Sequence, residues 1–217
     1  MTTEECALLR SKSQEAGVAM IELAAWLVVL FPVTLFALAL CATTHDRNIV
    51  QTIPETLMRE SPGRIMTWRS DKRGGEFVVD TARLRALTSQ LADRALNEVS
   101  SATFKLKSAA VRACYWVYSI DSHTGVTIGL RAQGCEERNS QGGLLEASLD
   151  SARNTRVSAG RLAEPVRIGS GRSQGYVSQA VLMGVSVGGR FGSWEGLCEQ
   201  EPVQHAAVWI PRGDSTL

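Results

Sequence analysis

Residues 17–44 read GVAMIELAAWLVVLFPVTLFALALCATT, and this stretch governs how the whole chain is interpreted. Its last 22 residues, from Leu23 to Thr44, contain no charged side chain. A helix rises about 1.5 Å per residue, so this run reaches about 33 Å, enough to cross a hydrocarbon core about 30 Å thick. The sequence therefore predicts a transmembrane helix over residues 18–44 and argues against a purely cytosolic globular enzyme.

Three other interpretations of the N-terminal region fit less well. A buried core helix of this length is rare in so small a protein. A cleaved secretory signal has an apolar region of about 7–15 residues, whereas the apolar stretch from Leu23 to Leu40 has 18. A lipoprotein signal requires a small residue before its cysteine, and Cys41 follows Leu40. A membrane helix with a short cytoplasmic leader explains the region better.

The orientation of this helix follows from the size of its flanking segments and not from their charge. Arg10 and Lys12 precede the helix, and Arg47 and Arg59 follow it at comparable distance. Long domains translocate largely regardless of charge. We therefore expect residues 45–217 to lie outside the cytoplasm.

A glycine and a glutamate stand at fixed spacing where the apolar helix begins. Gly17 is followed five residues later by Glu22, and the apolar run starts directly after it. A carboxylate costs roughly 2.5–3.5 kcal/mol at the bilayer centre and less near the interface, so Glu22 at this position requires an explanation. Snorkelling of Glu22 to the headgroup level is the simpler one. Together with the short polar leader and the long helix, however, the pattern resembles the processing site of type IV prepilins.

This resemblance implies a processing step and a role for the glutamate. A dedicated prepilin peptidase would cut between Gly17 and Val18, and Glu22 would become the fifth residue of the mature chain. Its carboxylate would then pair with the α-ammonium of Val18 on a neighbouring subunit.

Within that class the chain most resembles the minor pseudopilins of tight-adherence (Tad) pili, the TadE/TadF type. Members have the same leader, a helix with an internal proline, and a modest α+β extracytoplasmic domain. Here the proline is Pro32, which leaves the carbonyl of Val28 without its helical partner and should kink the helix. The resemblance implies no cofactor and a bacterial inner-membrane protein whose domain is periplasmic or incorporated in a pilus. The implied partners are other pilin subunits, the prepilin peptidase, an inner-membrane assembly platform and membrane lipid.

The remaining chain divides into a connector and a domain. Residues 45–76 are polar and interrupted by prolines and glycines, so they predict a connector with at most a short helix near Glu55 to Glu60. Residues 77–217 are expected to form a self-contained domain. Its first helix begins after Asp80, a favourable N-cap, with Val79 and Leu84 placed as a hydrophobic staple. One apolar stripe then recurs at helical spacing: Leu84, Leu87, Leu91, Ala95 and Val99.

A β-hairpin is expected next, from residues 111–120 and 126–132. If Gly125 adopts a left-handed conformation in a three-residue loop, Tyr118 pairs with Leu130 and Ile120 with Ile128, so that all apolar side chains share one face. Residues 136–175 resemble an exposed excursion, and strands are expected over residues 176–187 and 206–210. The predicted fold class is α+β, an N-terminal transmembrane helix followed by an extracytoplasmic helix packed on an antiparallel β-sheet.

Three of the five cysteines lie in the expected oxidising compartment: Cys114, Cys135 and Cys198. In the unbroken hairpin register Cys114 faces Gly134, so Cys135 points to the opposite face and a direct bond between Cys114 and Cys135 needs a bulge. The predicted disulfide is therefore Cys135–Cys198, with Cys114 as a buried thiol.

The composition and motifs indicate no catalytic, metal or nucleic-acid site. The chain of 217 residues has 23 Lys and Arg against 22 Asp and Glu, whereas nucleic-acid binders normally carry a basic surplus. Gly184 to Gly188 matches the G-x-S-x-G nucleophile elbow, but the residues that follow are poor helix formers, so Ser186 is expected to be an ordinary strand residue. A membrane-tethered hydrolase rests on that serine alone. The main alternative to a minor pilin is a single-pass membrane-anchored periplasmic binding or sensor domain.

Overall fold

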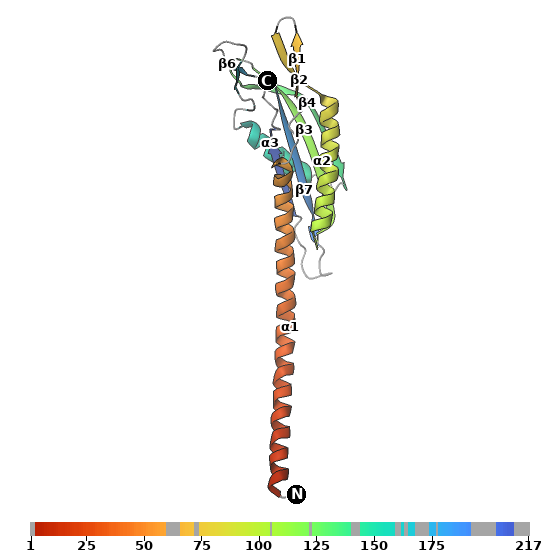
Figure 1. The fold of residues 1–217 in the computed structure, drawn as a ribbon, viewed down its shortest axis with the longest axis vertical. Coiled ribbons are helices and arrows are strands. Elements are labelled where there is room, and N and C mark those ends of the chain that lie inside the picture. The colour runs from red at the N-terminus through yellow and green to blue at the C-terminus, as the bar shows by residue number, and fades with distance from the viewer. Residues whose placement is uncertain are drawn as a thin grey trace. The chain divides into compact units, whose positions relative to one another are not determined.

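The computed structural model of the chain describes most of its residues: 3–59, 66–71, 74–104, 106–121, 123–139, 144–158, 162, 165–167, 174–176, 178–191 and 203–210. The chain forms two compact units, Met1–Thr44 and His45–Leu217. The first is helical, and the second combines helices with an antiparallel sheet, which confirms the α+β class (Figure 1).

The helix α1 (Thr3–Arg59) is longer than expected, because it continues through the residues assigned to a connector. The prediction of at most a short helix near Glu55 to Glu60 is therefore wrong for residues 45–59. Val50, Ile53 and Leu57 are spaced to share one helical face, and all three are buried in the core of the second unit. This burial offsets the helical hydrogen bond that Pro54 removes.

The main sheet has four antiparallel strands in the order β4-β3-β7-β8. They are β3 (Leu106–Ile120), β4 (Thr127–Arg138), β7 (Gln179–Phe191) and β8 (Val203–Trp209). Each neighbouring pair is antiparallel. Because β4 and β8 stand at the two ends of the strand order, they are the edge strands. The strands expected over residues 176–187 and 206–210 correspond to β7 and β8.

Two small hairpins and a third helix were not expected from the sequence. The hairpins are β1 (Met66–Asp71) with β2 (Gly74–Val79), and β5 (Pro165–Arg167) with β6 (Gln174–Tyr176). The helix is α3 (Leu144–Ser158), which lies inside the region expected to be an exposed excursion. Its Leu145 and Leu149 are buried, so this region contributes to the core.

The helix α2 (Thr81–Ala102) begins where the sequence predicted. The Asp80 side chain accepts hydrogen bonds from the backbone N–H groups of Ala82 and Arg83, both at 3.0 Å, which confirms it as the N-cap. Three residues of the predicted apolar stripe are buried, namely Leu84, Ala95 and Val99. Thr88 and Ala92 are buried beside them, and Leu87 and Leu91 are partly buried.

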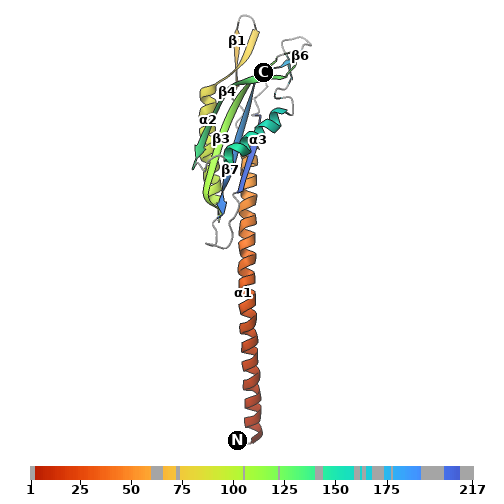
Figure 2. The same ribbon diagram turned by 180° about the vertical axis from the view of Figure 1, so that it is seen from behind.

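The central strand β3 is buried on both faces, whereas the hairpin was expected to have one apolar face. Ala113, Tyr115 and Val117 belong to a core cluster that also contains residues of α2 and of α1 after His45. Trp116 and Tyr118 belong to a second cluster with residues of α3. Figures 1 and 2 show α2 and α3 on either side of these strands.

The edge strand β4 has the opposite character. Apolar side chains at its start remain exposed to solvent: Val126 (56%), Ile128 (71%) and Leu130 (46%). Within the hairpin, Gly125 has a positive φ of 72° as predicted, and Tyr118 pairs with Leu130. Ile120 pairs with Thr127 and not with Ile128.

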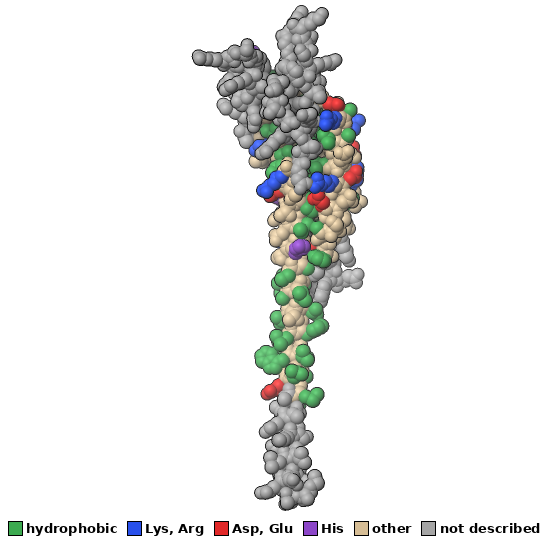
Figure 3. Space-filling model, viewed as in Figure 1, with side chains coloured by type: hydrophobic (Ala, Val, Ile, Leu, Met, Phe, Trp, Pro, Cys, Tyr) green, Lys and Arg blue, Asp and Glu red, His purple; other side chains and the backbone are tan. Residues whose placement is uncertain are grey.

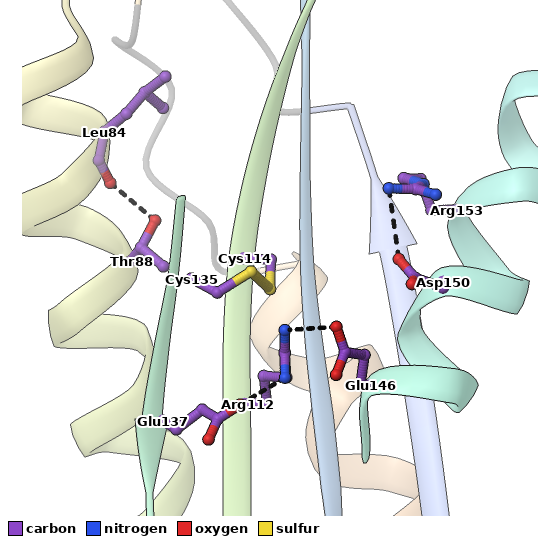
Figure 4. Close-up of a disulfide and its surroundings, with 9 residues drawn as sticks. All are labelled: Leu84, Thr88, Arg112, Cys114, Cys135, Glu137, Glu146, Asp150 and Arg153. Atoms are coloured by element: carbon purple, nitrogen blue, oxygen red, sulfur yellow. Dashed lines mark hydrogen bonds and ion pairs between the residues drawn. A yellow bond between two sulfur atoms is a disulfide. The ribbon is translucent and has the colours of Figure 1, made fainter. Parts of the chain in front are cut away.

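A register shift in this hairpin determines which cysteines form the disulfide. The register shifts between Val117 and Tyr118, because Val117 pairs with Ala132 while Tyr118 pairs with Leu130. The extra residue in β4 brings Cys135 directly opposite Cys114, and the two form a disulfide with their Cα atoms 4.1 Å apart (Figure 4). The predicted Cys135–Cys198 bond is therefore wrong, since an unbroken register was assumed; Cys198 itself lies outside the described residues.

Candidate functional site

The N-terminal part of α1 exposes a continuous apolar surface. Most large hydrophobic side chains from Met20 to Leu40 are between 49% (Leu30) and 75% (Val28) exposed, whereas Leu35 is partly buried. Figure 3 shows hydrophobic side chains covering this part of the helix. Each Å² of apolar surface left in water costs about 25 cal/mol, so this exposed apolar surface is unfavourable in water.

The region Met20–Arg59 is the one helix, among the described residues, that is long and apolar enough to cross a membrane. None of its most apolar part is buried within the chain, unlike the core helix of a soluble protein. An N-terminal signal sequence passes the same test of length and apolar composition. The structure thus supports a membrane-anchor or signal helix at the predicted place.

Gly17, Val18 and Glu22 all lie within α1. Glu22 is exposed and stands beside the first exposed apolar residues of the span. Val18 precedes Glu22 by four residues in this helix. A new N-terminus at Val18 would place the positive end of the helix dipole within one turn of the Glu22 carboxylate.

Pro32 lies in the middle of the same apolar segment. The helix continues through it without interruption, and the Thr34 hydroxyl donates to the carbonyl oxygen of Phe31 at 2.8 Å. The kink expected at Pro32 stays a prediction.

Asp46 connects α1 to the loop between α2 and β3. Its side chain is fully buried, and its two oxygens accept from the backbone N–H groups of Phe104 (2.9 Å) and Leu106 (3.0 Å). Beside it, the rings of His45 and Phe104 lie 5.5 Å apart, centroid to centroid. Asp46 thereby satisfies backbone donors at the start of β3, where α2 has already ended.

Ion pairs join β4 to both neighbouring helices. On one side of the sheet, Arg112 of β3 pairs with Glu137 of β4 and, at 3.2 Å, with Glu146 of α3 (Figure 4). On the other, Arg138 pairs with Asp93 of α2 at 2.6 Å and with Glu136 at 3.3 Å. The hydrogen bonds to Asp93 and Glu136 raise the pKa of Arg138. These contacts fix the edge strand and offer no reactive group.

The interior of the second unit holds few groups that could react. Ser186 lies within β7, which continues as a strand to Phe191, as the sequence predicted. It is buried, and its hydroxyl has no hydrogen-bond partner among the described atoms. Burial raises the pKa of Tyr118, opposed by the charge of Arg153. In the part of the chain that the structure describes, no three His, Cys, Asp or Glu residues are placed to hold a metal ion.

Sequence reasoning missed two residues at the base of the domain, Asp46 and Phe104. Asp46 was assigned to a polar connector, where a charged residue is unremarkable. Asp46 follows the end of the uncharged run and precedes the apolar pair Ile49 and Val50, so it marks the point within α1 where the apolar pattern changes. This position is the sequence signal that could have located it.

Comparison with known proteins adds no identification. No protein-family model, curated protein or solved structure matches this chain. Function must therefore be argued from the helix and its first residues.

Proposed function

We propose that the chain is a membrane-anchored minor pilin, or pseudopilin, that takes part in the assembly or initiation of a Tad-type type IV pilus. The observation that carries this proposal is Glu22, an exposed carboxylate at the start of an exposed apolar helix, five residues after Gly17. A lone anchor helix requires neither the glycine nor the acidic residue.

In this proposal the exposed apolar helix serves two purposes. It anchors the subunit in the bacterial inner membrane before assembly, and it packs against the helices of other pilin subunits afterwards. The α+β domain, with α2 packed on the sheet, lies in the periplasm or on the pilus. Prepilin peptidase, the other subunits and the assembly platform are the partners, and no cofactor takes part.

Processing gives Glu22 its role. Cleavage between Gly17 and Val18 creates an α-ammonium, which the Glu22 carboxylate of a neighbouring subunit can neutralise within the membrane. In low-dielectric surroundings, losing one partner of such a pair costs about 3–5 kcal/mol, because the other charge remains uncompensated.

The first test is the mature N-terminus. Intact-mass analysis of protein extracted from the membrane of a strain with a Tad system should show a chain that begins at Val18. A Gly17→Leu variant should retain residues 1–17. Wild-type protein that begins at Met1 in a piliated strain would contradict processing and favour the membrane-anchored binding or sensor domain.

The second test separates processing from assembly. Glu22→Gln keeps the size and removes the charge, so it should be cut normally but remain in the inner membrane and fail to support piliation. Glu22→Asp keeps the charge and is the matched control, with at least partial piliation expected. Normal pilus counts in the Glu22→Gln strain would contradict the proposed charge pairing.

A further inference from the structure

Four large apolar residues outside the apolar helix are exposed in the described part of the chain: Phe104, Val126, Ile128 and Leu130. Three of them lie together at the tip of the β3–β4 hairpin. Phe104 stands apart from these in the loop between α2 and β3, and it is the most exposed of the four at 79%. Single exposed apolar residues are common on protein surfaces, so the place of Phe104 in the chain, and not its exposure alone, indicates what it can contact.

The position of Phe104 along α1 is defined by two contacts. Its backbone N–H donates to Asp46 at 2.9 Å, and its ring lies 5.5 Å from that of His45. His45 directly follows Thr44, the last residue of the uncharged run. Phe104 therefore contacts the residue that is bonded directly to the end of the uncharged run.

We propose that Phe104 is a membrane-interface anchor, inserted among lipid headgroups and upper acyl chains beside the end of the apolar helix. This inference rests on the proposed membrane insertion of that helix. Aromatic and apolar side chains of interfacial segments enter the boundary between headgroups and acyl chains by about 5–10 Å.

The charged residues Asp46 and Arg47, which follow His45, are compatible with a lipid surface. Asp46 would repel anionic headgroups if it were exposed, but it is fully buried and its oxygens are occupied by backbone donors. Arg47, the next residue, is exposed and carries the charge that anionic lipids attract. Asp46 therefore adds no exposed carboxylate next to Phe104, and Arg47 adds an exposed cation one residue further along α1.

The hairpin tip provides an internal control. Ile128 is 71% exposed, close to the value for Phe104, but it lies at the other end of β3. Thirteen residues separate Leu106 from Ser119 in β3, which corresponds to about 40 Å at about 3.3 Å per residue. The exposed fractions of Phe104 and Ile128 are thus similar, but the two residues lie near opposite ends of β3.

Photo-crosslinking of the full-length chain tests the anchor. Position 104, 128 or 38 is replaced, one at a time, by p-benzoylphenylalanine, and each protein is reconstituted into vesicles of phosphatidylethanolamine and phosphatidylglycerol. After irradiation, mass spectrometry counts lipid adducts. We expect positions 38 and 104 to yield several-fold more lipid adducts than position 128.

The outcomes separate this inference from the proposed membrane insertion. Lipid adducts at position 38, with position 104 no higher than position 128, would overturn the anchor and leave insertion intact. An absence of lipid adducts at position 38 would overturn insertion and the anchor together. Adducts of position 104 with a second copy of the chain, in place of lipid, would make it a subunit contact and overturn the lipid assignment.

A second variant tests the role of Asp46. In the Asp46→Ala background, the loop loses the carboxylate that holds it beside His45, so lipid adducts at position 104 should fall while those at position 38 stay unchanged. Circular dichroism of the variant shows that the domain remains folded. An unchanged yield at position 104 would show that Asp46 does not position the ring.

Discussion

Residues 20–44 and 45–59 belong to one helix, yet their apolar side chains lie in different surroundings. In the first part, Val28 and Leu38 are 75% and 66% exposed. In the second, Val50 and Leu57 are 0% and 1% exposed and belong to the core of the His45–Leu217 unit. The first part is apolar all round, whereas the second has an apolar stripe on an otherwise polar helix. The arrangement of the apolar residues, more than their number, separates the exposed part of the helix from the buried part.

The largest effect should come from removing the second part of this helix. A fragment that begins at His45 should fold as a soluble domain, and one that begins at residue 77 should not. The shorter fragment lacks Val50, Ile53 and Leu57, whose burial stabilises by about 1.5–3 kcal/mol each, and a typical domain has only about 5–15 kcal/mol in total. Circular dichroism and size-exclusion chromatography of both fragments check this. A folded 77–217 fragment would restore the boundary expected from the sequence.

A matched pair of leucine substitutions sharpens the same comparison. Leu57→Ala should lower the free energy of unfolding of the domain by about 2–5 kcal/mol, because it opens a cavity in a packed core. Leu40→Ala, at a side chain that is 50% exposed, should leave domain stability within about 0.5 kcal/mol. Urea denaturation of the full chain in detergent gives both values. Equal effects would contradict the difference between the exposed and the buried part of α1.

The disulfide should stabilise the domain whether or not the apolar helix is present. Cys114 and Cys135 are 21 residues apart, so loop-closure entropy predicts a loss of about 3 kcal/mol on replacing both with alanine. The loss should be the same in the full chain and in the 45–217 fragment. Non-reducing peptide mapping supplies the direct check, and a Cys135–Cys198 peptide would contradict the bulged register.

Two acidic residues of α1 should respond differently to substitution. Asp46→Ala leaves the N–H groups of Phe104 and Leu106 without their acceptor, which costs about 1–3 kcal/mol for a buried polar group. Glu22→Ala removes an exposed side chain and should leave thermal stability of the domain unchanged. Thermal unfolding of the two variants measures the difference. Equal stability of both would place Asp46 outside the folded core.

The smallest effect concerns pH and the hairpin turn. The backbone N–H of His123 and the hydroxyl of Thr124 donate to Asp121, and these bonds lower the pKa of its carboxyl group. A lowered pKa means stabilisation that is present at neutral pH and lost as pH falls through the folded-state value. Wild-type unfolding midpoints should therefore approach those of Asp121→Asn only at pH below about 4. A constant difference down to pH 2 would contradict this.

Local signals predicted much of the fold because their causes lie within a few residues. Asp80 caps α2 through its own neighbours, and Gly125 takes the left-handed conformation that its turn requires. The helix α3 was not predicted because its apolar stripe is short, with Leu145 and Leu149 as its buried leucines. These side chains are buried only because α3 packs against β7 and β8.

The sequence alone determined the apolar helix, the Gly17–Glu22 spacing that suggests processing, the α+β class and the pairing of Tyr118 with Leu130. These depend on length, spacing and short-range sterics. Only the tertiary structure decided that residues 45–59 complete the core, that Cys114 bonds to Cys135, and that Asp46 holds Phe104 beside His45. Each of these requires partners distant in sequence. The stripe of Val50, Ile53 and Leu57 is visible in the sequence, but which side chains it meets, and where a one-residue bulge shifts the register, depends on the folded sheet.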